Sequence, residues 1–127
     1  MTANANPSLA VVERFVDSIE RGDLAALDSC FAPHARIWHN TDQKWATTQE
    51  SSVGTAYYFE AFASRKYKID RLEPLPNGVL LQFVATIVRA DGRTMDWPGC
   101  VVFEIEQGAI VKLMEYIDLA SFTAAVG

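Results

Sequence analysis

The hydrophobic pattern of this chain changes period once, near residue 64, and that change decides its fold class. Before it, apolar residues recur every three to four positions, which is the spacing of helices with one buried face. After it, stretches rich in β-branched and aromatic residues follow one another, as is typical of strands. Helices followed by a run of strands indicate an α+β fold rather than alternating βαβ units.

The first two helices are expected directly after the N-terminus. Leucine, valine, phenylalanine and isoleucine share one face of a helix over about 8–20, and Gly22 provides its stop signal. Asp23 can cap a second, shorter helix that carries Phe31. We expect this helix to end at Pro33, because proline has no backbone N–H and disfavours helix in the residue before it.

A short strand over 36–40 and a third helix complete the first half. Thr47 and Glu50 have the three-residue spacing of a capping box, so the helix is expected to begin there. The apolar residues expected on this helix are Val53, Tyr57, Phe59 and Phe62.

The second half predicts four strands joined by hairpins. The turns are Asn77-Gly78, Asp91-Gly92 and Gln107-Gly108, because these residues tolerate positive φ. The strands cover 67–75, 79–89, 94–106 and 109–118, and a final helical turn follows over 121–126. We expect a curved antiparallel sheet that wraps around the three N-terminal helices as a cone with one open mouth, in a single domain over 1–127.

Charge and composition exclude several classes of partner. The chain has 11 Lys and Arg against 16 Asp and Glu, a net charge of −5, which disfavours nucleic acid and anionic membrane surfaces. No apolar run approaches the roughly 18 residues of a spanning helix, and residues 1–8 lack the features of a signal peptide. Cys30 and Cys100 lie too far apart for a metal pair. We therefore expect a soluble, cytoplasmic protein without a metal site.

Polar side chains stand at the tips of two expected strands. Trp38-His39-Asn40 closes the early strand, and Glu115-Tyr116-Ile117-Asp118 closes the last one. Strand alternation puts His39 and Asn40 on opposite faces, so only one of them points straight into a pocket unless a bulge intervenes. If the fold joins the two tips, they line one small-molecule pocket.

Local residues in this order resemble the nuclear-transport-factor-2-like superfamily. They are Val12-Glu13-Arg14-Phe15-Val16, Gly22-Asp23-Leu24 and Phe31-Ala32-Pro33-His34-Ala35. The superfamily includes ketosteroid isomerases, limonene epoxide hydrolases and SnoaL-like polyketide cyclases. The resemblance covers nearly the whole chain and implies a cystatin-like α+β barrel and a homodimer formed through the outer sheet face. It does not fix an activity, because one fold hosts many functions.

Compared with the isomerases, the pocket mouth differs. His39 falls where those enzymes place their aspartate base, and histidine can still move protons near neutral pH. Their oxyanion hole needs a tyrosine and a protonated carboxylic acid. Phe15 and Val101 occupy those positions here, so isomerase activity is not expected.

Compared with the epoxide hydrolases, the match is closer. Trp38-His39-Asn40 resembles their aromatic-x-Asn strand end, and the resemblance implies that Glu115 stands at their catalytic carboxylate. Ala85 and Phe83 replace the Asp–Arg pair that activates the epoxide. Activation of a water by Glu115 remains possible, whereas the complete epoxide mechanism does not fit. In SnoaL-like proteins an acidic residue near the end of the last strand is common, and Asp118 fits that position.

Two functions remain open at this stage. The first is a small enzyme, needing neither cofactor nor metal, that uses acid–base chemistry on a small hydrophobic, oxygen-bearing molecule. The second is a non-catalytic ligand-binding or dimerisation module. Instead of taking part in catalysis, Glu115 could lie on the solvated face of the sheet, and Asp118 could cap the final helical turn. The expected catalytic residues are His39, Glu115 and Asp118, and the expected substrate-binding residues are Trp38, Asn40, Phe15, Tyr57, Tyr58, Phe62, Trp97 and Tyr116.

Overall fold

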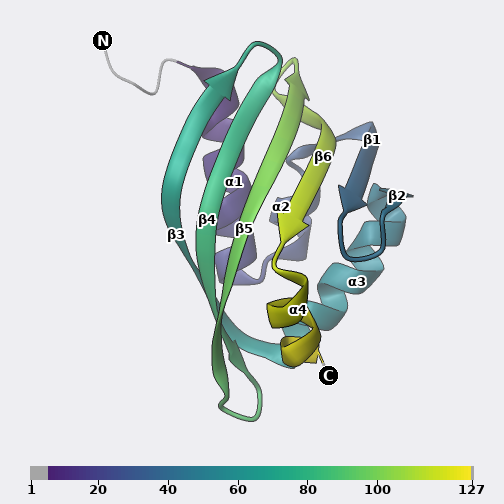
Figure 1. Ribbon diagram of the computed structural model, residues 1–127. Coiled ribbons are helices and arrows are strands. Elements are labelled where there is room, and N and C mark those ends of the chain that lie inside the picture. The colour runs from purple at the N-terminus through teal and green to yellow at the C-terminus, as the bar shows by residue number, and fades with distance from the viewer. Residues whose placement is uncertain (1–5, 127) are drawn as a thin grey trace.

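The computed structural model describes residues 6–126 and confirms the α+β class (Figure 1). Residues 1–5 and 127, at the ends of the expected single domain, lie outside the described residues. The helices are α1 (Pro7–Arg21), α2 (Leu24–Asp28), α3 (Thr48–Ala61) and α4 (Leu119–Val126). The strands are β1 (Phe31–His39), β2 (Lys44–Thr47), β3 (Phe62–Leu75), β4 (Gly78–Arg89), β5 (Thr94–Glu106) and β6 (Ala109–Ile117).

The predicted helix signals are found where the sequence places them. Gly22 ends α1 in the left-handed region at φ +66°, and its N–H donates to the carbonyl of Ile19 at 3.1 Å. Thr47 and Glu50 form the expected capping box at the start of α3. These local contacts fix the helix boundaries before any long-range packing is considered.

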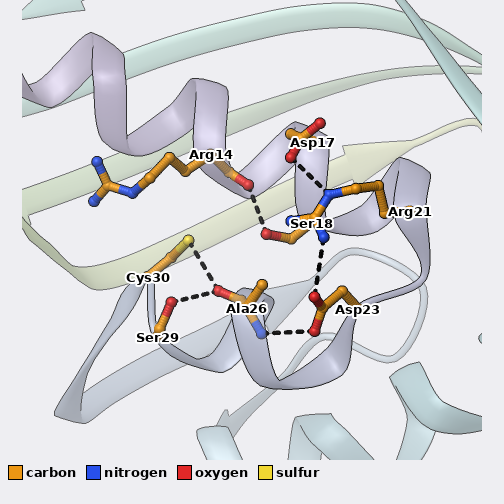
Figure 2. Close-up of polar contacts among 8 residues, drawn as sticks. All are labelled: Arg14, Asp17, Ser18, Arg21, Asp23, Ala26, Ser29 and Cys30. Carbon is orange, nitrogen blue, oxygen red and sulfur yellow. Dashed lines mark hydrogen bonds and ion pairs between the residues drawn. The ribbon is translucent and has the colours of Figure 1, made fainter.

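A small polar network holds the corner between α1 and α2 (Figure 2). Arg21 donates from Nε to Asp17 at 2.8 Å and from Nη1 to Asp23 at 3.0 Å. Asp23 also caps α2, accepting from the N–H of Ala26 at 3.0 Å. The corner turns α2 back beneath α1, so that Leu27 joins the core.

One six-stranded sheet forms the other layer, in the order β2-β1-β6-β5-β4-β3. Helices α1 and α2 cover one of its faces (Figure 1). The sheet is not closed, since β2 and β3 are its edges. Neighbouring strands are antiparallel except β1 and β6, which are parallel. This parallel pair corrects the expectation of a wholly antiparallel sheet, because the early strand adds to the far side of the hairpin series.

Two local expectations are wrong, and one strand was not expected. The second helix ends at Asp28, and Pro33 lies inside β1, in the irregular stretch between the pairs Phe31–Ile110 and Arg36–Lys112. Proline is tolerated there because no ladder bond needs its missing N–H. Phe62 begins β3 rather than ending α3. Strand β2 was not expected, since its four residues are too short to show a period.

The core fills the space between α1 and the middle of the sheet. Val11 and Val12 of α1 are 1% and 0% exposed. The ring of Phe15 packs against the ring of Phe103 in β5, with ring centres 5.1 Å apart. Helix α3, in contrast, has no buried residue. Within residues 6–126, no helix has both the length and the apolar character needed to cross a membrane.

Candidate functional site

A cavity of about 340 Å³ lies between the helices and the inner face of the sheet. Its apolar walls come from α1, α2, α3 and the six strands, and they include Phe15, Ile19, Ile37, Phe59, Ile87 and Leu113. Its mouth is polar and includes Asp28, Thr41, Asp42, Lys44, Glu50 and Ser52. A volume of this size is at the lower end of ligand pockets and suits a small molecule.

His39 and Glu115 meet inside this cavity. They are register partners in the parallel ladder of β1 and β6, and the Nε2 of His39 lies 3.3 Å from the Oε1 of Glu115. Both share the inward face with Ile37 and Leu113, each 4% exposed, two positions before them. The side chains keep 36% and 21% exposure, so His39 stands nearer the mouth than Glu115. The two expected strand tips are therefore brought together.

The side chain of Asn40 holds the end of β1 against the end of β6. Its side-chain Nδ2 donates to the carbonyl of Ile117 at 3.0 Å, and its Oδ1 accepts from the N–H of Ile117 at 3.0 Å. The amide thus continues the parallel ladder past the end of β1, as a backbone peptide would. His39 lines the cavity and Asn40 does not, which answers the question that strand alternation left open.

Glu115 is a carboxyl group in an apolar enclosure. Desolvation raises its pKa above the ordinary value, because burial penalises the charged form, while the nearby His39 acts in the opposite direction. A carboxyl with a raised pKa binds a proton more readily near neutral pH. Glu115 lines the cavity on the same face of β6 as the buried Leu113, so the solvated-face alternative for Glu115 does not hold.

Two tyrosines reach the cavity from different elements. Tyr58 lies on α3 and Tyr67 on β3. Burial raises the pKa of Tyr58 to about 12, and the negative charge of Glu115 adds to that shift. The same two causes raise the pKa of Tyr67 well above its ordinary range. Both phenols therefore keep their protons and can donate hydrogen bonds at neutral pH.

Arg65 of β3 is the buried cation of the cavity wall, at 8% exposure. Its Nε donates to the carbonyl of Ile19 at 2.8 Å and its Nη1 to the carbonyl of Phe62 at 2.8 Å. Its guanidinium also lies 4.7 Å from the ring centre of Phe59. The position at the C-terminal turn of α1 suits a cation, since helix carbonyls point there. Arg65 therefore ties α1, α3 and β3 together.

The structure divides the eleven expected site residues into two groups. Those that line the cavity are Phe15, His39, Tyr58, Phe62, Trp97 and Glu115. Those outside its lining are Trp38, Asn40, Tyr57, Tyr116 and Asp118. Alternation along β1 and β6 separates the two groups, because Trp38 and Tyr116 lie on the opposite face of the sheet from His39 and Glu115.

The residues outside the lining have other contacts. Trp38 and Tyr116 pack against each other with ring centres 5.1 Å apart. Tyr57 is 61% exposed on α3. Asp118 accepts hydrogen bonds from the N–H and hydroxyl of Ser121, which lower the pKa of its carboxyl and cap α4. Asp118 thus matches its alternative as a helix cap.

Sequence reasoning missed Tyr67 and Arg65. Both were obscured because the strand was expected to begin at Tyr67, whereas β3 begins at Phe62. With the correct start, Arg65 and Tyr67 are two residues apart and share the inward face. Among the residues that the structure describes, no group of three or more His, Cys, Asp or Glu is arranged to hold a metal ion.

Comparison with known proteins identifies the family. Residues 12–113 match the SnoaL-like domain, so the chain belongs to that family. A candidate SnoaL-like polyketide cyclase from Jannaschia has 16% identity and a TM-score of 0.81 over 99% of this chain and 95% of its own. An epoxide hydrolase of the limonene type from M. tuberculosis has 16% identity and a TM-score of 0.77 over 94% and 88%.

A third structure, a protein with a ketosteroid isomerase-like fold from Catenulispora acidiphila in complex with trimethylamine, has 14% identity. Its TM-score is 0.79 over 91% of this chain and 90% of its own. No curated protein sequence matches the chain significantly. Identities this low show a shared fold alone. Because 371 solved chains match that fold, the reaction has to be argued from the site itself.

Proposed function

We propose that this SnoaL-like protein is a small enzyme that transfers protons on a hydrophobic, oxygen-bearing molecule bound in the cavity. The observation that carries the proposal is the pairing of His39 with Glu115 at 3.3 Å inside an otherwise largely apolar enclosure. Acid–base groups that face an enclosed cavity, with at least one shifted pKa, are the pattern of a catalytic site.

Glu115 is the general base in this proposal. Its raised pKa makes the carboxylate a stronger base than an exposed glutamate, because its conjugate acid gives up the proton less readily. The carboxyl oxygens can take a proton from carbon or from a bound water. Which of the two occurs separates an isomerase or cyclase from a hydrolase.

His39 is the partner of that base. Its Nε2 faces the carboxylate, and its greater exposure places the ring on the route between Glu115 and the polar mouth. An imidazole in this position can pass the proton to solvent and return it for the next turnover. Trp97 and Phe62 line the same space and provide apolar contact for the substrate.

Tyr58 and Tyr67 complete the proposed site as hydrogen-bond donors. Phe15 and Val101 stand where isomerases have the hydrogen-bond donors of their oxyanion hole. For that reason the sequence did not predict an oxyanion hole in this chain. The two protonated phenols supply donors from α3 and β3 instead. They bind the oxygen of the substrate, where negative charge develops when a proton leaves.

The test is isotope exchange on a substrate panel. Small cyclic ketones, enones and epoxides are incubated with the protein in D₂O or in H₂¹⁸O and followed by mass spectrometry. Deuterium gain at carbon above the rate without protein shows proton abstraction, and ¹⁸O gain in the diol formed from an epoxide shows water activation. We expect Glu115→Gln to abolish the exchange and Glu13→Gln, a change on the exposed face of α1, to leave it unchanged. Exchange that survives Glu115→Gln would refute the proposal.

The second candidate is a ligand-binding or dimerisation module, and the outer sheet face favours it. Trp38 and Tyr116 form an aromatic contact there, and Tyr116 and the neighbouring Trp45 are 50% and 43% exposed. Lys112 lies 5.7 Å from the ring centre of Trp45. We propose that this face joins two copies in a homodimer. Light scattering on Tyr116→Glu should show monomers, and an unchanged mass would exclude Tyr116 from the interface.

A further inference from the structure

We infer that the ligand of this cavity is an organic cation: a tertiary or quaternary ammonium group on a small hydrophobic body, held between an aromatic corner and Glu115. The aromatic corner is formed by Tyr58, Phe62 and Trp97. The inference rests on the proposed function, because it names the chemical class of molecule that the same cavity receives. Two independent features support it, the geometry of the rings and the balance of charge.

The aromatic corner brings three packed rings to the cavity wall. The rings of Tyr58 and Phe62 are parallel within 4°, with centres 5.7 Å apart. Trp97 stands at 88° to each of them, at 6.4 Å and 5.6 Å. All three line the cavity. Aromatic rings that line a cavity can attract ammonium groups to their faces, tryptophan most strongly.

Glu115 lacks a permanent positive partner. Its ion-pair contact within the described part of the chain is with His39, which is charged only when protonated. A carboxylate enclosed among apolar groups is unfavourable without a counter-charge. An ammonium ligand supplies that charge, whereas a neutral ligand displaces water and leaves the carboxylate less solvated than before.

The charges around the cavity also favour a cation. The carboxyl groups among the described lining residues are Asp28, Asp42, Glu50 and Glu115, and the permanent cations are Lys44 and Arg65. Arg65 already donates to the carbonyls of Ile19 and Phe62. Three of the four carboxyls lie at the mouth, so an approaching ligand meets a negative field that concentrates cations and repels anions.

The test uses three probes of matched shape: choline, its neutral isostere 3,3-dimethylbutan-1-ol, and the anion 3,3-dimethylbutanoate. Binding is followed by chemical-shift changes of labelled methyl groups in Ile37, Ile87 and Leu113, which line the cavity. We expect choline to bind about tenfold more tightly than the alcohol, as a cation–π contact and a facing carboxylate together allow. The anion should bind most weakly.

Three variants locate the preference. Glu115→Gln should reduce the choline preference to near parity while the alcohol still binds, which also shows that the cavity is intact. Trp97→Leu should weaken choline more than the alcohol, because it removes a π surface and keeps apolar volume. Glu13→Gln, at an exposed carboxylate outside the cavity lining, should leave the ratio unchanged.

The outcomes separate this inference from the proposed function. Equal or tighter binding of the alcohol, a preference for the anion, or no binding of choline to these methyl groups would overturn the ammonium inference. Glu115-dependent isotope exchange on neutral substrates would leave the proposed catalysis standing in that case. A strong choline preference without any exchange would instead support the inference and remove the catalytic proposal.

Discussion

Helices α1 and α3 face the same side of the sheet and meet it in opposite ways. Helix α1 buries Val11, Val12 and Phe15 in the core against the sheet, and its Phe15 and Ile19 also border the cavity. Helix α3 buries no residue completely and lines the cavity with Tyr58 and Phe59 instead. One face of the sheet therefore packs against the core residues of α1 at one end and borders the proposed ligand cavity under α3 at the other.

The difference follows from sequence pattern. The apolar residues of α1 lie on one face, which matches the sheet. Those of α3 are spread around the helix, with Val53 75% exposed and Tyr57 61% exposed. A helix without one apolar face cannot close against the sheet, and the space it leaves is the cavity.

Removing a ring from the packed half should produce the largest effect. Phe103 is fully buried against Phe15, so Phe103→Ala should lower the free energy of unfolding by about 3–5 kcal/mol through lost contacts and a new void. Tyr57→Ala on α3 removes a similar ring from an exposed position and should cost less than about 1 kcal/mol. Urea unfolding measures both. Equal losses would show that the two halves are not distinct.

The amide of Asn40 joins β1 to β6 at the border of the two halves. Asn40→Ala leaves the N–H and carbonyl of Ile117 without their side-chain partner and should cost about 1–3 kcal/mol. It should also loosen the contact of His39 with Glu115, so any activity should fall more than stability alone explains. Unfolding and turnover on the same samples test this. An unchanged free energy of unfolding in Asn40→Ala would show that the two amide hydrogen bonds do not stabilise the fold.

The ionised carboxylate of Glu115 should lower the free energy of unfolding, and the size of this effect should depend on pH. Its pKa is higher in the folded protein than the ordinary 4.5, so its ionisation favours the unfolded state. The stability present below pH 4.5 is therefore lost as the pH rises through the folded-state pKa. Glu115→Gln should be more stable than the parent protein at pH 8, by about 0.5–2 kcal/mol.

That difference should shrink as the pH falls towards 4. Thermal unfolding of both proteins across this pH range measures it. A Glu115→Gln variant that is less stable than the parent protein at pH 8 would contradict the assignment of Glu115 to a desolvated position.

The sequence predicts the frame of this molecule well and its site only in part. Hairpin signals such as Gln107-Gly108 are local, and both residues have the positive φ that such a turn requires. β3 begins at Phe62, and both Phe62 and Arg65 are buried there by long-range packing, which the hydrophobic period alone does not contain. The misplaced start of the strand hid Tyr67 as a cavity residue.

The meeting of His39 with Glu115 depends on a parallel pairing between strands that are distant in the chain. Strand alternation predicts that His39 and Asn40 face opposite sides of the sheet, but it does not predict which of the two faces the cavity. That choice is made by the amide of Asn40, which pairs with the backbone of Ile117. No local pattern in the sequence contains this contact.

The most direct test of the site is a ¹³C NMR titration of the Glu115 carboxyl, assigned by the loss of its signal in Glu115→Gln. We expect a midpoint above the ordinary 4.5, because the group is desolvated in the cavity. In His39→Gln the midpoint should rise further, since the neighbouring imidazole holds it down. A midpoint at or below 4.5 that does not respond to His39→Gln would show a solvated carboxylate with no partner, and the acid–base site would not exist.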